Sequence, residues 1–124
     1  MSEQKNILLV EDELLLSNIL KSRLEKEGFK VFQARDGEMA LKFLRETKPD
    51  IILLDIILPK ISGFEILEEL QKNPELQSAP VAIISNLGQE SDIQKGRSLG
   101  AINYFVKAQV TIDELVGKIR KMLV

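Results

Sequence analysis

The chain has 124 residues, the length of one domain with a single core, and its 44% hydrophobic and 29% charged residues are typical of a globular protein. Its formal net charge of -2 argues against a nucleic-acid partner, because such binding depends on an excess of Lys and Arg. The sequence contains no Cys and no His, which excludes disulfides, thiolate catalysis and any imidazole relay or metal site built from its own residues.

The sequence carries no signal for a membrane. Residues 1–6 are polar and too short for a secretory signal, and no apolar run approaches the length of a membrane span. We therefore expect a cytoplasmic protein without a membrane partner.

The first predicted element is a short buried strand at Lys5–Val10, because its residues are almost continuously apolar. An amphipathic helix follows, and we expect it to end at Gly28, as a glycine cap would end it. The apolar face of this helix has a spacing of three and four residues: Leu16, Ile19, Leu20 and Leu24. A shorter, mixed strand is predicted at Lys30–Ala34.

Two further buried strands are predicted in the middle of the chain. Ile51–Leu54 follows the turn signal at Pro49, and Val81–Ile84 follows Pro80. A last, mixed strand is predicted at Ile102–Val106.

The helix predicted at Gln89–Ser98 differs from the others in composition. It carries one large apolar residue, Ile93, and a Gly96 that costs about 1 kcal/mol relative to alanine. We expect it to be the most loosely held helix. The final helix is strongly amphipathic, with an apolar face formed by Ile112, Leu115, Val116, Ile119 and Leu123.

Strands and helices therefore alternate along the chain. Five strands alternating with five helices indicate an α/β protein with a parallel sheet covered by helices on both faces.

Acidic residues directly follow two of the predicted strands. Glu11 and Asp12 follow the first strand, and Asp55 follows Ile51–Leu54. Because ligands of such sheets gather at the carboxyl ends of the strands, we expect these carboxylates in one small region. Their mutual repulsion is costly unless a cation lies between them. Carboxylate oxygens suit Mg²⁺, which also binds phosphate oxygens.

Each acidic residue also has a plainer interpretation. Glu11 and Asp12 would simply begin a helix, where their negative charges interact favourably with the helix dipole. Asp55 would be an ordinary turn residue. The ends of two further strands favour a functional site over this plainer interpretation. The hydroxyl of Ser85 and the ammonium of Lys107 are expected there, beside the carboxylates. A phosphoryl group on Asp55 needs a cation, a hydroxyl donor and a positive charge around its oxygens, and this set supplies all of them.

With these residues in place, the chain resembles a response-regulator receiver domain from end to end. The resemblance is carried by Glu11-Asp12, Asp55 within LLLDIILP, Pro59, Gly63, Ser85, Tyr104 and Lys107. The family implies a flavodoxin-like (βα)5 fold, a doubly wound five-stranded parallel sheet with the order 2-1-3-4-5, and one receiver domain over residues 1–124.

The resemblance also implies a ligand set for Mg²⁺. Asp12 and Asp55 would bind the ion directly, Glu11 would act through water, and the backbone carbonyl of Ile57 would complete the protein ligands.

The remaining roles follow from the same resemblance. Asp55 would accept a phosphoryl group from a histidine kinase or a histidine phosphotransfer protein, without being an enzyme for any separate substrate. Ser85 and Lys107 would hold the phosphoryl oxygens, and Tyr104 would be an aromatic rotamer switch. We expect a stand-alone receiver, a monomer or weak dimer, that binds its target through the fourth helix, fifth strand and fifth helix.

Three departures from the family pattern stand out. Asn86 stands where a small residue is usual, next to the hydroxyl. Ile57 and Leu87 flank the site with apolar side chains that position a hydrolytic water poorly. The family's Lys-Pro pair is Lys107-Ala108, and we expect this peptide bond to be trans, because a cis bond without proline costs about 2.5–4 kcal/mol.

Three other functions were weighed against this one. A haloacid-dehalogenase-type phosphatase needs a carboxylate two residues after the nucleophile, where this chain has Ile57. A flavodoxin-like FMN carrier needs a loop rich in Ser, Thr and Gly where this chain has Glu11 and Asp12. A pseudo-receiver that signals only by protein contact stays open because of Asn86.

Overall fold

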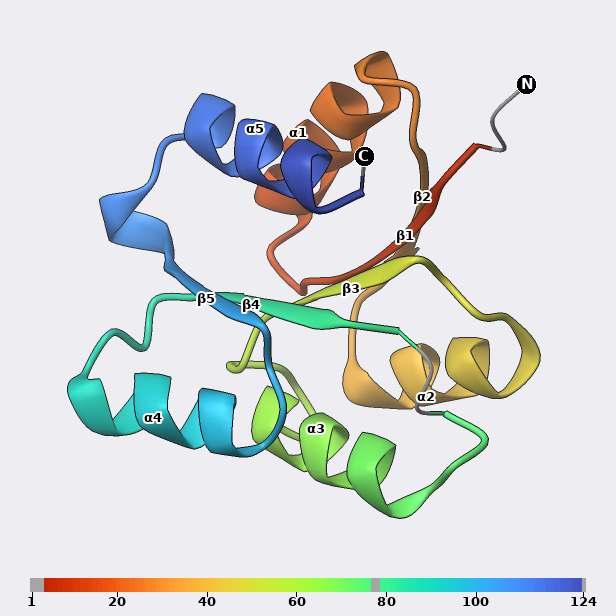
Figure 1. The fold of residues 1–124 in the computed structure, drawn as a ribbon, viewed down its shortest axis with the longest axis vertical. Coiled ribbons are helices and arrows are strands. Elements are labelled where there is room, and N and C mark those ends of the chain that lie inside the picture. Colours follow the sequence, from red (N-terminus) through yellow and green to blue (C-terminus); the bar gives the residue numbers. More distant parts are fainter. Residues whose placement is uncertain (1–3, 77–78, 124) are drawn as a thin grey trace.

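A five-stranded parallel sheet forms the centre of the computed structural model, which describes residues 4–76 and 79–123 (Figure 1). Its strands are β1 (Asn6–Val10), β2 (Lys30–Ala34), β3 (Ile51–Leu54), β4 (Val81–Ser85) and β5 (Asn103–Val106). The strand order is β2-β1-β3-β4-β5, and every neighbouring pair is parallel.

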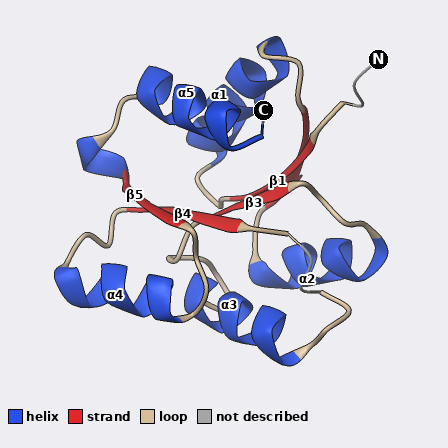
Figure 2. Cartoon of the chain, in the orientation of Figure 1, coloured by secondary structure: helices blue, strands red, loops and turns tan. Residues whose placement is uncertain are grey.

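Helices cover both faces of this sheet. They are α1 (Leu14–Lys26), α2 (Gly37–Glu46), α3 (Gly63–Lys72), α4 (Glu90–Ser98) and α5 (Ile112–Leu123). Helices α1 and α5 lie on one face, and α2, α3 and α4 lie on the other (Figure 2). The predicted flavodoxin-like doubly wound α/β fold is therefore confirmed, including its strand order. Among the described residues, no helix combines the length and the apolar character needed to cross a bilayer.

Each face of the sheet carries its own hydrophobic core, because successive side chains of a strand point to opposite faces. In β1, Leu8 and Val10 pack with residues of α2 and α3, whereas Ile7 and Leu9 pack with residues of α1 and α5. All of these strand residues are buried. The central strands are buried on both faces, so their almost continuous apolar sequence follows from the architecture.

Local side-chain contacts set the starts of two helices. The Asp36 carboxylate accepts a hydrogen bond of 2.9 Å from the backbone N–H of Met39 at the start of α2. Ser62 and Glu65 form a reciprocal capping box at the start of α3. At the end of α1, Gly28 adopts a φ of 97°, the left-handed conformation that favours glycine after a helix, as predicted.

Some predicted boundaries and one predicted core residue were wrong. β1 begins at Asn6 rather than Lys5, β5 begins at Asn103 rather than Ile102, and α4 begins at Glu90 rather than Gln89. Ile19 is 40% exposed. Ser17 is buried instead, and its hydroxyl is satisfied by a hydrogen bond of 2.9 Å from Gln33 Nε2 in β2.

Candidate phosphorylation site

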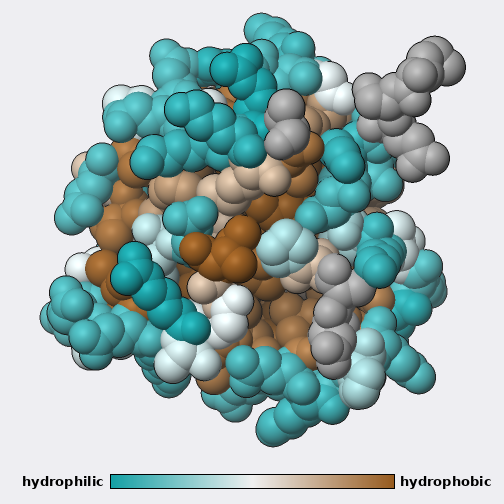
Figure 3. Space-filling model, in the orientation of Figure 1, coloured by the Kyte–Doolittle hydropathy of each residue, from teal (hydrophilic) through white to brown (hydrophobic). Residues whose placement is uncertain are grey.

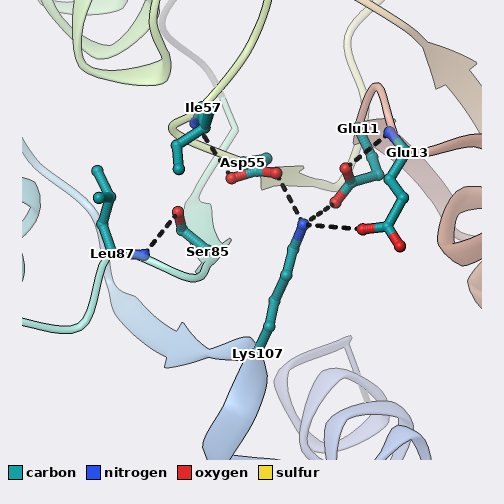
Figure 4. A network of polar contacts seen from close by, with 7 residues as sticks. All are labelled: Glu11, Glu13, Asp55, Ile57, Ser85, Leu87 and Lys107. Atoms are coloured by element: carbon teal, nitrogen blue, oxygen red, sulfur yellow. Dashed lines mark hydrogen bonds and ion pairs between the residues drawn. The ribbon is translucent and has the colours of Figure 1, made fainter.

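Four side chains converge at the carboxyl end of the sheet (Figure 4). Glu11 directly follows β1, Asp55 follows β3, Ser85 is the last residue of β4, and Lys107 follows β5. Because all these strands are parallel, their ends meet at one edge although the residues lie far apart in sequence. Glu11, Asp55 and Ser85 are all buried. Burial is rare for carboxylates such as Glu11 and Asp55 unless they have a partner.

The ammonium group of Lys107 lies between the acidic side chains. Its Nζ atom is 2.8 Å from Asp55 Oδ2, 2.8 Å from Glu11 Oε1 and 3.8 Å from Glu13 Oε2. The Lys107 side chain is only 13% exposed, so both close ion pairs are shielded from water. Lysine thus supplies the positive charge that the two buried carboxylates require.

The environment shifts the proton affinity of two of these groups. Burial raises the pKa of Glu11, and the negative charge of Asp55 adds to this effect, while the hydrogen bond from Lys107 opposes it. Burial alone would lower the pKa of Lys107. Its hydrogen bonds and charge attraction to Asp55 and Glu11 together outweigh burial, so that this pKa is raised and the ammonium stays charged.

Three carboxylates form a group with the chemistry of a divalent-cation site. One oxygen from each of Glu11, Asp12 and Asp55 lies within 4.8 Å of the others. Asp12 is exposed, whereas the other two are buried. A donor set made of carboxylate oxygens fits Mg²⁺, and Lys107 leaves an excess of negative charge that such an ion would offset.

Backbone N–H groups donate hydrogen bonds to the side chains of Asp55 and Ser85. The N–H of Ile57 donates to Asp55 Oδ1 at 3.2 Å, and the N–H of Leu87 donates to Ser85 Oγ at 3.3 Å. The side chains of Ile57 and Leu87 flank Asp55 and Ser85 (Figure 4). Asn86 is exposed. The apolar flanks expected from the sequence are therefore present.

Tyr104 lies outside this polar network but is connected to it. Its hydroxyl donates to the backbone carbonyl of Leu87, in the loop that follows Ser85. Its ring packs against Gly96 of α4, where an added Cβ would lie 3.0 Å from Tyr104 Cδ2. Burial raises the pKa of Tyr104, and the negative charges of Asp92 and Asp55 contribute.

The peptide bond between Lys107 and Ala108, directly after β5, is trans. Residues Lys107–Gln109 form a short 3₁₀ turn, and every peptide bond within residues 4–76 and 79–123 is trans. The expected trans conformation of Lys107-Ala108 is confirmed.

The plainer interpretation of the first acidic pair does not fit this geometry. Glu13, not Glu11 or Asp12, precedes the first residue of α1, and its side chain makes no capping hydrogen bond. The buried Glu11 instead faces Lys107. Glu13 was not predicted as a neighbour of Lys107, although it follows Glu11 by only two residues.

The fold and this edge of the sheet define a doubly wound α/β protein with an acidic site, completed by a lysine and a hydroxyl, at the carboxyl ends of its strands. Residues 7–120 match the model of the response regulator receiver domain, and the chain belongs to that family. It is therefore a signalling module of the two-component type.

Two curated relatives illustrate the similarity. The phosphate regulon transcriptional regulatory protein PhoB of Rhizobium meliloti is 38% identical over 117 residues, which cover 94% of this chain and 51% of that protein. A probable transcriptional regulator, ycf27, of Cyanophora paradoxa is 36% identical over 120 residues, which cover 97% and 48%. The chain spans about half the length of these relatives.

Solved structures show the same fold. The receiver domain of the Francisella response regulator 1452 has a TM-score of 0.88 and 26% identity, with 97% of each chain covered. The phosphorylated cyanobacterial phytochrome response regulator RcpA has a TM-score of 0.83 and 30% identity, with 97% of this chain and 91% of that chain covered.

Proposed function

We propose that this protein is a phosphorylation switch whose acceptor is the carboxylate of Asp55. The observation that carries the proposal is a buried carboxylate held 2.8 Å from a lysine ammonium, with Glu11 and Asp12 within reach of one shared cation. In the reaction, an Asp55 oxygen attacks the phosphorus of a phosphohistidine. The P–N bond breaks, and its electron pair stays on the imidazole of the partner protein.

The other side chains of the site hold the transferred group and the metal ion. Asp12, Asp55 and the Ile57 carbonyl would bind Mg²⁺ directly, with Glu11 acting through water. When bound, Mg²⁺ offsets the negative charge that gathers on the phosphoryl oxygens. This frees Lys107 to contact one of those oxygens.

Ser85 completes the contacts to the phosphoryl group. Its hydroxyl accepts a hydrogen bond from Leu87 N–H in this structure and has its own proton to donate to a phosphoryl oxygen. The donor hydroxyl and the ammonium of Lys107 would thus lie on two sides of the acceptor.

A protein donor fits the surroundings of the site better than a small molecule alone. Large apolar side chains are exposed on the N-terminal half of α1, near the start of α2 and in the loop after β3: Leu14, Leu15, Ile19, Met39 and Ile57. Exposed apolar surface is typical of regions that contact other proteins, and these side chains supply such surface. We infer that a histidine kinase or a histidine phosphotransfer protein delivers the phosphoryl group.

The signal would leave through the face made by α4, β5 and α5. Tyr104 of β5 connects the loop after Ser85 with α4, through the Leu87 carbonyl and Gly96. Movement of Ser85 toward a phosphoryl group would pull this loop and change the packing of α4. Apolar surface gathers in a band between α4 and α5, over the edge of the sheet at β5 (Figure 3). We propose this face as the surface that binds the target protein.

Intact mass measurement after incubation with acetyl phosphate and Mg²⁺ tests the acceptor. Wild-type protein should gain one phosphoryl group, and Asp55→Asn should gain none, because an amide is a poor nucleophile. Labelling that persists in Asp55→Asn would move the acceptor elsewhere, with Ser85 examined first. A wild type that is never labelled would instead favour a pseudo-receiver that acts by protein contact.

Amide exchange with and without beryllofluoride, a phosphoryl mimic, tests the output face. We expect protection to change in residues 86–107 as well as around Asp55, because the loop after β4 connects the two regions. If changes stay confined to the neighbourhood of Asp55, the proposed path through Tyr104 is wrong.

A further inference from the structure

The tip of the loop between β3 and α3 adopts a strained backbone conformation. Lys60 has a φ of 72°, and it is the single residue other than glycine with a positive φ in the described part of the chain. The N–H of Ile61 donates to the carbonyl of Pro59 at 2.9 Å, so the chain reverses in a γ-turn around Lys60. A γ-turn with positive φ is rare, and such strain persists only where surrounding contacts hold it.

Contacts to the start of α2 hold this tip. Lys60 Nζ lies 3.1 Å from Glu38 Oε2 and 3.6 Å from Asp36 Oδ2. Ile61, the next residue, lies directly over Gly37, where an added Cβ would be 2.2 Å from Ile61 Cγ1. Ion pairs and close packing thus fasten the tip of the loop to the first turn of α2.

The base of the same loop belongs to the phosphorylation site. The N–H of Gly63 donates to the carbonyl of Ile56 at 2.8 Å and closes the loop. Next to it, the N–H of Ile57 donates to the Asp55 carboxylate. A loop that is closed at its base and fastened at its tip has little freedom, so the backbone between these points is held in one conformation.

We propose that Lys60 is a positioning residue of the phosphorylation site: its ion pairs to Asp36 and Glu38 hold the loop that carries the Ile57 carbonyl. The proposal rests on the proposed function, which makes that carbonyl a ligand of Mg²⁺. Exposed ion pairs contribute little to folding stability. Contacts behind a metal ligand, however, change metal affinity on the order of tenfold or more when they are removed.

Positioning and simple charge effects predict opposite results for the removal of this lysine. Loss of a positive charge makes the protein more attractive to a cation, so Lys60→Gln would tighten Mg²⁺ binding if Lys60 acted only through its charge. If Lys60 positions the loop, Lys60→Gln raises the Kd for Mg²⁺ on the order of tenfold. Lys60→Arg keeps the ion pairs and should keep the wild-type affinity.

Calorimetric titration with Mg²⁺ distinguishes these cases. The variants are Lys60→Gln, Lys60→Arg and the control Arg120→Gln. Arg120 has nearly the same exposure as Lys60, 55% against 54%, and its ion pair with Glu27 lies on the opposite face of the sheet. We expect weaker binding in Lys60→Gln alone. Amide exchange of residues 57–62 in magnesium-free protein should also become faster in this variant, and not in the control.

Two results would count against the proposal in different ways. A Kd in Lys60→Gln that equals the wild-type value, or falls below it, would overturn the positioning role and leave the magnesium site intact. A wild type that binds no Mg²⁺ would overturn the metal site of the proposed function, and the role of Lys60 with it.

Discussion

At the scale of single residues, Lys107 decides the charge balance of the site. It pairs with Glu11 and Asp55 at the same time, both at 2.8 Å. Two carboxylates can therefore be buried side by side before any phosphoryl group or metal ion is present. In the proposed mechanism this ammonium exchanges a carboxylate partner for a phosphoryl oxygen, so it is never left buried without a partner, which would be costly.

Tyr104 provides a direct spectroscopic test of the local electrostatics, because it is the only tyrosine and the sequence has no tryptophan. Burial, followed by the charges of Asp92 and Asp55, raises its pKa. We predict that the phenol of the folded protein ionises at a higher pH than that of the denatured chain. Ultraviolet absorbance of the phenolate during a pH titration measures both.

The sign of the linked stability change follows from this shift. Between the pKa of the unfolded chain and the higher pKa of the folded protein, the folded state binds more protons at Tyr104. This contribution to stability is complete below the unfolded value and is lost as the pH rises through the folded value. Asp92→Asn should move the folded titration part of the way back. A phenol that ionises at the same pH in both states would contradict the burial of this ring.

At the scale of elements, α4 differs from the other helices because few of its residues are buried. Of its nine residues, all within the described part of the chain, only Gly96 is buried. That α4 is the most loosely held helix stays a prediction, and this sparse burial supports it. From the sequence, Gly96 was expected only to weaken the helix. In the structure its lack of a side chain also lets α4 lie close to Ile83 and Tyr104.

The substitution Gly96→Ala separates helix propensity from packing. Propensity alone predicts a gain of about 1 kcal/mol. The new Cβ would lie 2.6 Å from Ile83 Cδ1 and 3.0 Å from the Tyr104 ring. We predict a loss of about 1–3 kcal/mol in the free energy of unfolding, because overpacking outweighs propensity. Urea denaturation measures the change.

Gly117 in α5 is the matched control for this substitution. It also lies inside a helix, but nothing lies within 4 Å of the Cβ that alanine would add. Gly117→Ala should therefore stabilise the protein by about 1 kcal/mol. Stabilisation of similar size in both variants would show that α4 moves away from β5 at little cost.

At the scale of the whole molecule, Mg²⁺ should act as a ligand of the folded state. The carboxyl ends of β1 and β3 bring Asp12 and Asp55 together only when the sheet is formed. Binding to the folded state alone stabilises it by RT ln(1 + [L]/Kd), or about 2.7 kcal/mol at a concentration of 100 times Kd. We predict a melting temperature that rises with Mg²⁺ concentration in a thermal denaturation series.

Asp12→Ala should remove most of this response, because it takes away one of the three carboxylates. Glu25→Ala removes an exposed carboxylate at the far end of α1 and should leave the response unchanged. A melting temperature that does not respond to millimolar Mg²⁺ in the wild type would weigh heavily against the metal site.

Local sequence patterns were enough to predict the elements and their order. Continuous apolar runs after Pro49 and Pro80 marked two central strands, and spacing of three and four residues marked α1 and α5. These patterns follow from the local geometry of strands and helices, so they can be recognised without knowing which distant residues are in contact. The place of Glu11, Asp55, Ser85 and Lys107 also followed, because parallel strands bring their carboxyl ends to one edge.

Which of these groups contact each other could not be predicted from local patterns, because it depends on the three-dimensional fold. Lys107 meets Asp55 across a separation of 52 residues, and the pairing depends on the strand order and on the turn after β5. The contacts of Gly96 with Tyr104, and of Lys60 with the start of α2, depend in the same way on how loops and helices pack. A linear pattern records which face a residue occupies but not which neighbour stands opposite, because that neighbour comes from another part of the chain.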